Sequence, residues 1–346
     1  MQNYDCKVDR TVSYVNQGTI LTGDTRQNGN NLDKSLTEIL LEKIRSYGDK
    51  TALVDDSNGG NSLTYNQFYN QVRNCAGYLY EQGLRKRDVV ALCSSNCLEF
   101  PVVMLGIIAC GARVSLCTPT FTKEKMFEHF QHCGPTMVIS TEEASETVDQ
   151  VVQKIRMVKK VIIIGESEKY ITTSYFFQST SDFPKVDINP NFDVAIISYA
   201  NDDNETLKDN STTHTSITRR IECIAQTLCW SPTKYDSQCN YFDIPMIQKL
   251  GVETMLASLF AGCKLVFRKR CDIKSMLEAV KTHQVTAVFT LETTAVGLME
   301  DGIKFDCGKS SLRIINFSGP TMQSELIEKV ERKYQVDVNQ DIQDSL

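Results

Sequence analysis

Long apolar runs, paired cysteines and an excess of basic charge are all missing from this 346-residue sequence. The longest apolar stretch, 100–116, is interrupted by Gly106, Gly111 and Arg113, whereas a membrane-spanning helix needs about 20 consecutive apolar residues. We therefore expect no membrane span. The formal net charge of −6 and the pI of about 5.4 provide no basic surface, which argues against a nucleic-acid partner.

The thirteen cysteines contain no C-x-x-C pair, and no secretion signal is recognisable. This pattern predicts an intracellular protein whose thiols are reduced and act mostly as small core residues. The four histidines are dispersed, although His129 and His132, followed by Cys133, could share one helix face. No second pair of ligands accompanies them, so a packing or solvated role is favoured over zinc binding.

What remains is an ordinary globular composition, 41% hydrophobic and 23% charged, in a chain long enough for two core-bearing units. From Leu32 onward, amphipathic helices alternate with short apolar strands, which is typical of βαβ units and largely parallel sheets. We interpret residues 1–30 as a polar arm, 31–172 as a first α/β subdomain, 173–192 as a linker with two prolines, and 193–346 as a second α/β subdomain.

The segment 197–217, ISYANDDNETLKDNSTTHTSI, contains a polar loop that the sequence places between a strand (194–199) and a helix (214–229). Loops that wrap phosphate use glycine, because converging backbone N–H groups require positive φ. This loop instead carries Asp202, Asp203 and Glu205, which would repel a bound triphosphate. Considered alone, it is an acidic surface loop.

Three longer segments resemble AMP-forming acyl-CoA synthetases, most closely the luciferase and 4-coumarate–CoA ligase branch. They are LTYNQFYNQVRNCAGYLYEQGLRKRDVVALCSSNCLEFPVVMLGIIACGARVSL, GVETMLASLFAGCKLVFRK and FSGPTMQSELIEKV. The resemblance runs from about Lys50 to the last residue. It implies an α/β fold of two βαβ-type subdomains, as in the large N-terminal domain of adenylate-forming ligases, and the small C-terminal domain has no counterpart here.

The resemblance implies an AMP-dependent ligase that joins a fatty or aryl carboxylic acid to coenzyme A. The acid would attack the α-phosphate of ATP, with Mg²⁺, to give an acyl-adenylate, and the thiol of coenzyme A would then take the acyl group. The expected partners are therefore a small carboxylic acid or its acyl-CoA. Such a protein would act in fatty acid metabolism, in the cytoplasm or the peroxisome.

The resemblance also assigns sites residue by residue. Three residues match the Lys and the Thr-His pair of the nucleotide loop, namely Lys208, Thr213 and His214. Ser318 and Gly319 match the start of the S-G-G-A-P loop, which lies against the adenylate in the family. The register set by Gly251 puts Gln248 where the family has a histidine that lines the acyl pocket, and glutamine still hydrogen-bonds but cannot become charged.

Several departures from the family pattern predict that catalysis by this chain is weak or absent. The loop glycines have become Asp202, Glu205 and Asp209. In the family motif Y-G-x-T-E, Ile342 stands at the Tyr position and Leu346 at the metal-binding Glu position. Leucine cannot ligate Mg²⁺, which requires oxygen donors, so we expect no metal ligand there.

An alternative function stays open, a non-catalytic relative that binds an acyl chain, an acyl-CoA or a protein partner. Acyl binding predicts an open tunnel around Gln248, Leu250 and residues 290–295, whereas the competing interpretation is that these residues pack as core. The terminus Asp344-Ser345-Leu346 does not match the S-K-L peroxisomal signal. The sequence indicates neither the acyl substrate nor the oligomeric state.

Overall fold

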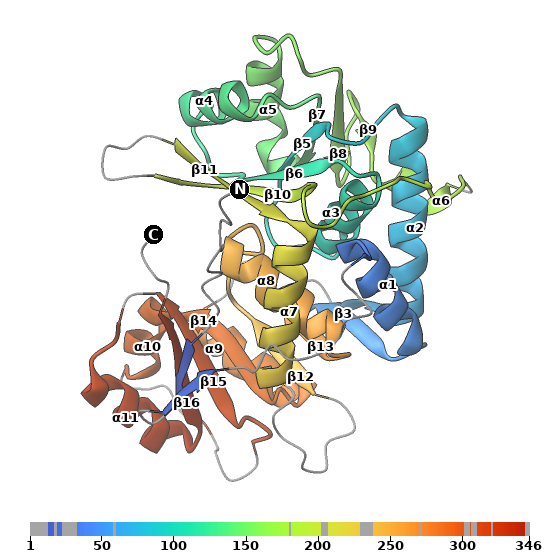
Figure 1. The fold of residues 1–346 in the computed structure, drawn as a ribbon. Coiled ribbons are helices and arrows are strands. Elements are labelled where there is room, and N and C mark those ends of the chain that lie inside the picture. The colour runs from blue at the N-terminus through green and yellow to red at the C-terminus, as the bar shows by residue number, and fades with distance from the viewer. Residues whose placement is uncertain are drawn as a thin grey trace, which may run out of the picture.

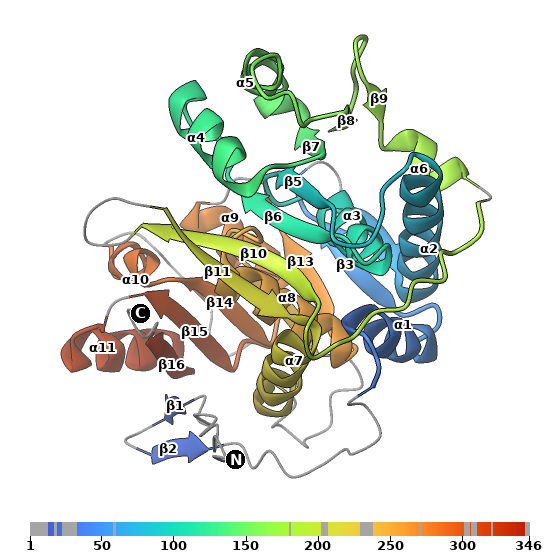
Figure 2. The same ribbon diagram turned by 45° about the horizontal axis from the view of Figure 1, so that its top comes forward.

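The computed structural model describes residues 13–16, 19–22, 33–57, 60–179, 181–201, 207–228, 238–269, 272–300, 305, 310–319 and 321–342. In these ranges the chain forms two mostly parallel sheets with helices packed between and around them (Figures 1 and 2). The predicted α/β class is confirmed. No helix within these ranges combines the length and the apolar character needed to cross a bilayer.

The sheet drawn mostly in green has seven strands in the order β11-β10-β6-β5-β7-β8-β9, and the hydrogen-bonded neighbours are parallel except β10 and β11. The strands are β5 (Val89–Cys93), β6 (Arg113–Cys117), β7 (Met137–Thr141), β8 (Lys160–Ile164), β9 (Ile171–Thr172), β10 (Val194–Asn201) and β11 (Leu207–Thr213).

The second sheet, drawn mostly in orange and red, has nine strands in the order β2-β1-β16-β15-β14-β12-β13-β3-β4, with parallel pairing from β16 to β3. The strands are β1 (Ser13–Asn16), β2 (Thr19–Thr22), β3 (Thr51–Asp55), β4 (Asn61–Thr64), β12 (Cys239–Phe242), β13 (Lys264–Phe267), β14 (Ala287–Leu291), β15 (Ile314–Gly319) and β16 (Asp337–Ile342).

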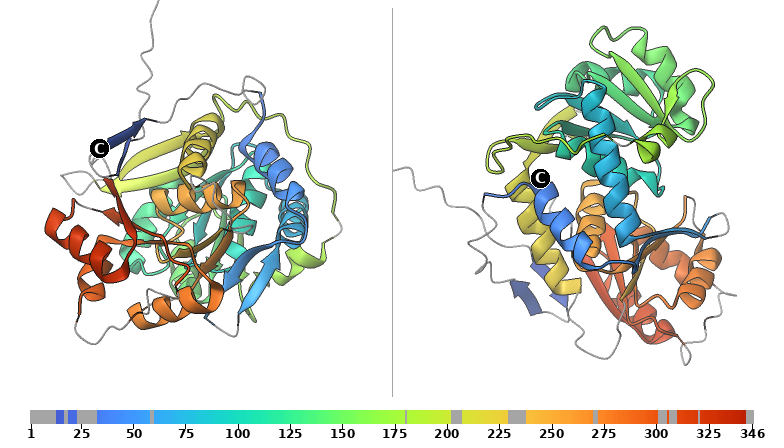
Figure 3. Two further views of the ribbon diagram at one scale, coloured as in Figure 1. Left: turned by 90° about the horizontal axis from the view of Figure 1, so that it is seen from below. Right: turned by 90° about the vertical axis from the view of Figure 1, so that its right-hand side faces the viewer.

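Both sheets combine early and late parts of the chain. The sequence divides the subdomains at residue 193, but β10 pairs with β6, and β3 pairs with β13 across that division. The residues 1–30, predicted as an arm without regular structure, contain β1 and β2, and β1 pairs with β16 (Figure 3). Short polar strands such as these lack the apolar alternation that marks a strand in sequence.

The helices are α1 (Leu36–Ser46), α2 (Tyr65–Glu81), α3 (Glu99–Ala109), α4 (Lys123–Cys133), the 3₁₀ turn η1 (Glu142–Ala144), α5 (Ser145–Val152), α6 (Ser174–Gln178), α7 (His214–Leu228), α8 (Lys249–Phe260), α9 (Ile273–His283), α10 (Glu292–Leu298) and α11 (Ser324–Tyr334). Both α3 and α8 are buried on nearly every face, as expected of helices in which apolar residues predominate. One hydrophobic cluster contains both helices and side chains of both sheets.

The predicted linker 173–192 includes a packed helix. Phe176 of α6 is fully buried, and its ring centroid lies 5.1 Å from that of Tyr78 on α2. The cysteines follow the prediction more closely, because all nine in the described ranges are free and six of them are buried.

Arg87, before β5, has a φ of 70°, a conformation that favours glycine. Its backbone N–H donates to the Gly111 carbonyl at 2.9 Å, and its own carbonyl accepts from the Arg113 guanidinium at 2.6 Å. These contacts hold the arginine backbone in an unfavourable conformation.

We predict that Arg87→Gly raises the free energy of unfolding by about 1 kcal/mol, because glycine adopts positive φ without steric cost. Denaturant titration followed by circular dichroism would measure the change. The control is Arg85→Gly, which has no positive φ to relieve and should not stabilise. A lower midpoint for Arg87→Gly would contradict the prediction.

Candidate functional site

The predicted nucleotide loop is part of a β-hairpin. The sequence predicts an unbroken loop from residue 199 to 214, but β11 pairs antiparallel with β10, and Lys208 lies opposite Ala200. Lys208 therefore lies on a strand rather than in a loop. The residues Asp202, Asp203 and Glu205 lie outside the described ranges. The strand was missed because its sequence, LKDNSTT, has no apolar alternation.

Thr213 and His214 join this hairpin to α7. The Thr213 hydroxyl accepts from the Ser216 backbone N–H at 3.3 Å, which is the hydrogen bond of a helix N-cap. His214 is 1% exposed, and its Nδ1 accepts from the Leu36 backbone N–H at 3.3 Å. The ring therefore connects the start of α1 to the start of α7.

Burial determines the charge state of this histidine. Desolvation of the charged ring lowers the pKa of His214 from 6.5 to about 4, although the nearby Asp193 opposes the shift. Because Nδ1 accepts a hydrogen bond, the neutral ring carries its proton on Nε2, which has no hydrogen-bond partner among the residues that the structure describes. This arrangement suits a neutral, structural histidine.

The predicted acyl-pocket residues lie at the start of α8. Gln248 is exposed at the N-cap, and its side chain makes no capping hydrogen bond. Its backbone N–H donates to the Pro245 carbonyl at 3.0 Å. Gly251 packs on the same carbonyl, since a Cβ at this position would lie 2.1 Å from the Pro245 oxygen. Glycine here therefore serves the close approach of the 245–248 turn to α8.

Ser318 and Gly319 end β15, between β14 and β16. Ser318 is 3% exposed and lies opposite Leu291 and Asp341 in the ladders. Gly319 has a φ of 136°, and a Cβ on it would lie 1.8 Å from Oε2 of Glu292. The Glu292 carboxylate, on the first residue of α10, thus covers this strand end.

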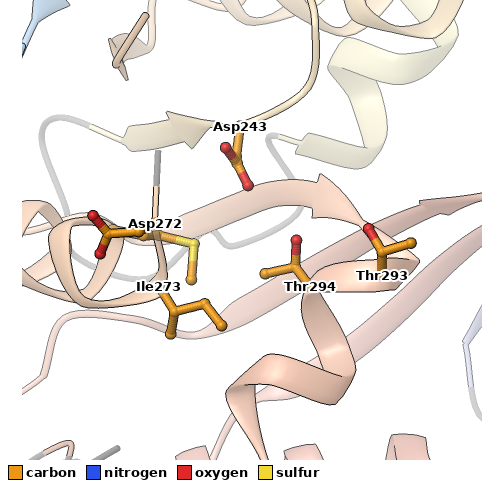
Figure 4. A pocket seen from close by; sticks show the side chains of 6 residues that line it. Asp243, Asp272, Ile273, Thr293 and Thr294 are labelled. Atoms are coloured by element: carbon orange, nitrogen blue, oxygen red, sulfur yellow. The ribbon is translucent and has the colours of Figure 1, made fainter. Parts of the chain in front are cut away.

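A pocket of about 140 Å³ opens near the carboxyl ends of β12 and β14 (Figure 4). About half of its lining is polar, and the lining residues are Asp243, Asp272, Ile273, Met276, Thr293 and Thr294. The Thr290 hydroxyl donates to Asp243 at 2.8 Å and lies 2.8 Å from the Thr294 hydroxyl. Asp243 was not predicted from the sequence. The available signal was a carboxylate directly after the strand segment CNYF.

The predicted acyl tunnel stays a prediction, because the pocket shares only a few of the residues expected to line that tunnel. Thr293 and Thr294, from the segment 290–295, line the pocket. Gln248 and Gly251 do not line the pocket. Leu250, on α8, is buried, with 8% of its surface exposed. Carboxylates and hydroxyls suit a small polar molecule better than a long aliphatic chain.

The two helix α4 histidines pack rather than converge on a metal. Nε2 of His129 lies 3.0 Å from the Ser115 hydroxyl, and burial lowers the pKa of His129 to about 4. The rings of His129 and His132 both meet Tyr199 edge-on, with centroid distances of 4.7 and 5.3 Å. Across the described ranges, no three His, Cys, Asp or Glu side chains are grouped to hold a metal ion.

The residues at the end of β15 fit a triphosphate poorly. The Glu292 carboxylate lies against Gly319, and a phosphate placed there would meet a like charge at short range. Ile342, the ladder partner of Gly319, stands at the position predicted to match the tyrosine of the family motif. The position of Leu346 lies outside the described residues.

We predict that the free energy of unfolding falls by about 2 kcal/mol per buried histidine between pH 7.5 and 5. The lowered pKa of His214 and of His129 means that the unfolded chain binds protons first, so stability is present above pH 6.5 and is lost toward pH 4. His214→Gln should remove about half of this loss. The control Thr213→Ala weakens the α7 cap equally at both pH values, and an unchanged slope in His214→Gln would refute the assignment.

We predict that Gly251→Ala lowers the free energy of unfolding by about 3 kcal/mol, because the new methyl group would overlap the Pro245 carbonyl. The matched control is Gly83→Ala, at φ 94° with no heavy atom within 4 Å of the added Cβ, which should cost about 1 kcal/mol. Thermal unfolding of both variants measures the difference, and equal effects would exclude the close contact.

The chain is similar in sequence to several curated plant proteins. The chain is 24% identical over 287 residues to 4-coumarate–CoA ligase-like 9 of Arabidopsis thaliana, covering 82% of this chain and 50% of that protein. It is 22% identical over 298 residues to Peroxisomal OPC-8:0-CoA ligase 1 of the same plant, covering 84% and 53%. The chain thus spans about half the length of the curated relatives it matches.

Solved structures share the fold. The luciferase-like enzyme from the nonluminescent Zophobas morio mealworm superposes with a TM-score of 0.78 at 20% identity, over 89% of this chain and 72% of that chain. The N-terminal domain of FACL13 from Mycobacterium tuberculosis gives 0.77 at 18% identity, over 89% and 75%. The family model described as AMP-binding enzyme matches residues 40–341, and this chain belongs to that family.

Proposed function

We propose that this chain carries the acid-recognition part of a fatty or aryl acid–CoA ligase, and that its own formation of an acyl-adenylate is slow. Family membership supports the substrate class, since the curated relatives named above are CoA ligases. The observation that carries the second part is the Glu292 carboxylate packed on Gly319.

Negative charge at the place where the phosphates would bind is expected to slow adenylation. Phosphoryl transfer is accelerated by positive charge and donors aimed at the phosphates, and a fixed carboxylate at that position opposes it. The loop residues Asp202, Asp203 and Glu205 add further negative charge in the sequence. His214 is buried against Leu36, so its ring serves the fold.

Acid recognition is less affected by these changes. Gln248 is exposed, its side-chain amide makes no capping bond, and it lies at the N-terminus of a twelve-residue helix. An amide donor at a helix N-terminus favours a carboxylate. The same observation supports the alternative, a non-catalytic relative that binds an acid or an acyl-CoA without activating it.

We predict that calorimetric titration of the purified chain with Mg·ATP gives no saturable heat at about 1 mM nucleotide. Glu292→Gln, which removes the charge at the end of β15 and keeps the side-chain shape, should tighten nucleotide binding about tenfold. The variant Lys208→Ala tests whether any nucleotide binding depends on the lysine of the β10–β11 hairpin. Saturable binding by the wild type that Lys208→Ala abolishes would refute slow adenylation and restore a full ligase.

The same chain titrated with 4-coumarate and with octanoate tests acid recognition. We expect one of the two acids to bind and Gln248→Ala to weaken it about tenfold, since the variant loses the amide donor. The control is Gln284→Ala, whose exposed side chain bonds only the Lys281 carbonyl among the interactions described. Absence of binding by both acids would refute acid recognition.

A further inference from the structure

Asn96 connects the two sheets at the turn that leads into α8. It lies in the loop after β5, in the seven-stranded sheet, and it reaches the segment after β12 of the other sheet. Its Nδ2 donates to the Ile244 carbonyl at 3.1 Å, and its Oδ1 accepts from the Met246 backbone N–H at 2.8 Å. The side-chain amide thus pairs with the turn as a neighbouring strand would.

The turn depends on this amide because it lies beyond the end of the β12 ladder. Asp243 N–H donates to the Phe289 carbonyl at 2.8 Å, which closes the ladder on this side. Pro245 has no N–H to donate, and its carbonyl receives the Gln248 N–H at 3.0 Å. The side chains of Ile244 and Met246 are buried, so their backbone groups have little access to water and need a partner.

The other face of the turn is fixed by α8. The Pro245 carbonyl rests on the Cα of Gly251, where even a methyl group would overlap it. Asn96 and Gly251 both contact the turn, and the conformation of the turn determines where Gln248 and the first N–H groups of α8 point.

We propose that Asn96 is a positioning residue for acid binding. It sets the 244–248 turn and thereby places the Gln248 amide and the N-terminus of α8 against the carboxylate of the acid. This inference rests on the proposed function, because it assumes that the acid binds beside Gln248. Asn96 acts from the other sheet, so acid binding depends on the contact between the two sheets.

A second contact between the sheets provides the matched control. Lys269, after β13, pairs with Glu143 of η1 at 2.7 Å, also joining the two sheets. Both side chains are partly exposed, at 48% and 30%, and neither touches the 244–248 turn in the contacts described. Lys269→Ala therefore loosens the same pair of sheets without removing a partner of the turn.

The experiment compares Asn96→Ala, Asn96→Asp and Lys269→Ala by two readouts, hydrogen exchange of the peptide containing Met246 and affinity for the acid that the wild type binds. Asn96→Ala should raise exchange at Met246 at least tenfold and weaken the acid about tenfold, with exchange in β5 unchanged. Asn96→Asp keeps the acceptor for the Met246 N–H and loses the donor to Ile244, so it should lie between. Lys269→Ala should leave both readouts near wild type.

Each remaining outcome overturns the proposal in a recognisable way. Unchanged exchange at Met246 in Asn96→Ala would show that the turn holds without the amide. Faster exchange with unchanged affinity would reduce Asn96 to a structural residue. Equal weakening by Lys269→Ala would assign the effect to general loosening of the sheets. If the wild type binds neither acid, the proposed function fails first, independently of Asn96.

Discussion

The burial of two helices on nearly every face is the constraint on which this fold depends. Most residues of α3 and α8 are apolar and buried, so each helix must be covered by protein on nearly all sides. Both sheets contribute to that cover, and their side chains join those of α3 and α8 in one hydrophobic cluster. A chain with two sheets thus obtains a shared core.

One buried residue of α8 carries an ionisable carboxyl group, which needs a compensating charge. Glu253, in the middle of α8, is 2% exposed, and burial raises the pKa of its carboxyl group. Arg220 of α7 lies 2.8 Å away and supplies the compensating charge. A buried carboxylate is costly without such a partner, so the ion pair between Arg220 and Glu253 favours the packing of α7 on α8.

The candidate sites lie at the carboxyl ends of strands and at the start of α8. Asp243 follows β12 and lines the pocket, Glu292 follows β14 and lies against Gly319 at the end of β15, and α8 offers an exposed amide at Gln248. Negative charge at the strand ends opposes a nucleotide, and the helix N-terminus favours a carboxylate. Membership of the AMP-binding enzyme family and the proposed slow adenylation are therefore compatible in one chain.

The sequence by itself determined the fold class, the alternation of strands and helices, and the family, because apolar periodicity and the three long matching segments are local properties of the chain. Gln248 and Gly251 lie near each other because both belong to the start of α8, and their role in an acyl pocket stays a prediction. Only the tertiary structure decided that β3 and β10 cross between the halves, that Lys208 lies on a strand, that His214 is buried on α1, and that Glu292 covers Gly319. These facts depend on contacts between residues far apart in the chain, and neither propensity nor spacing encodes which distant carbonyl, ring or carboxylate will meet a given side chain.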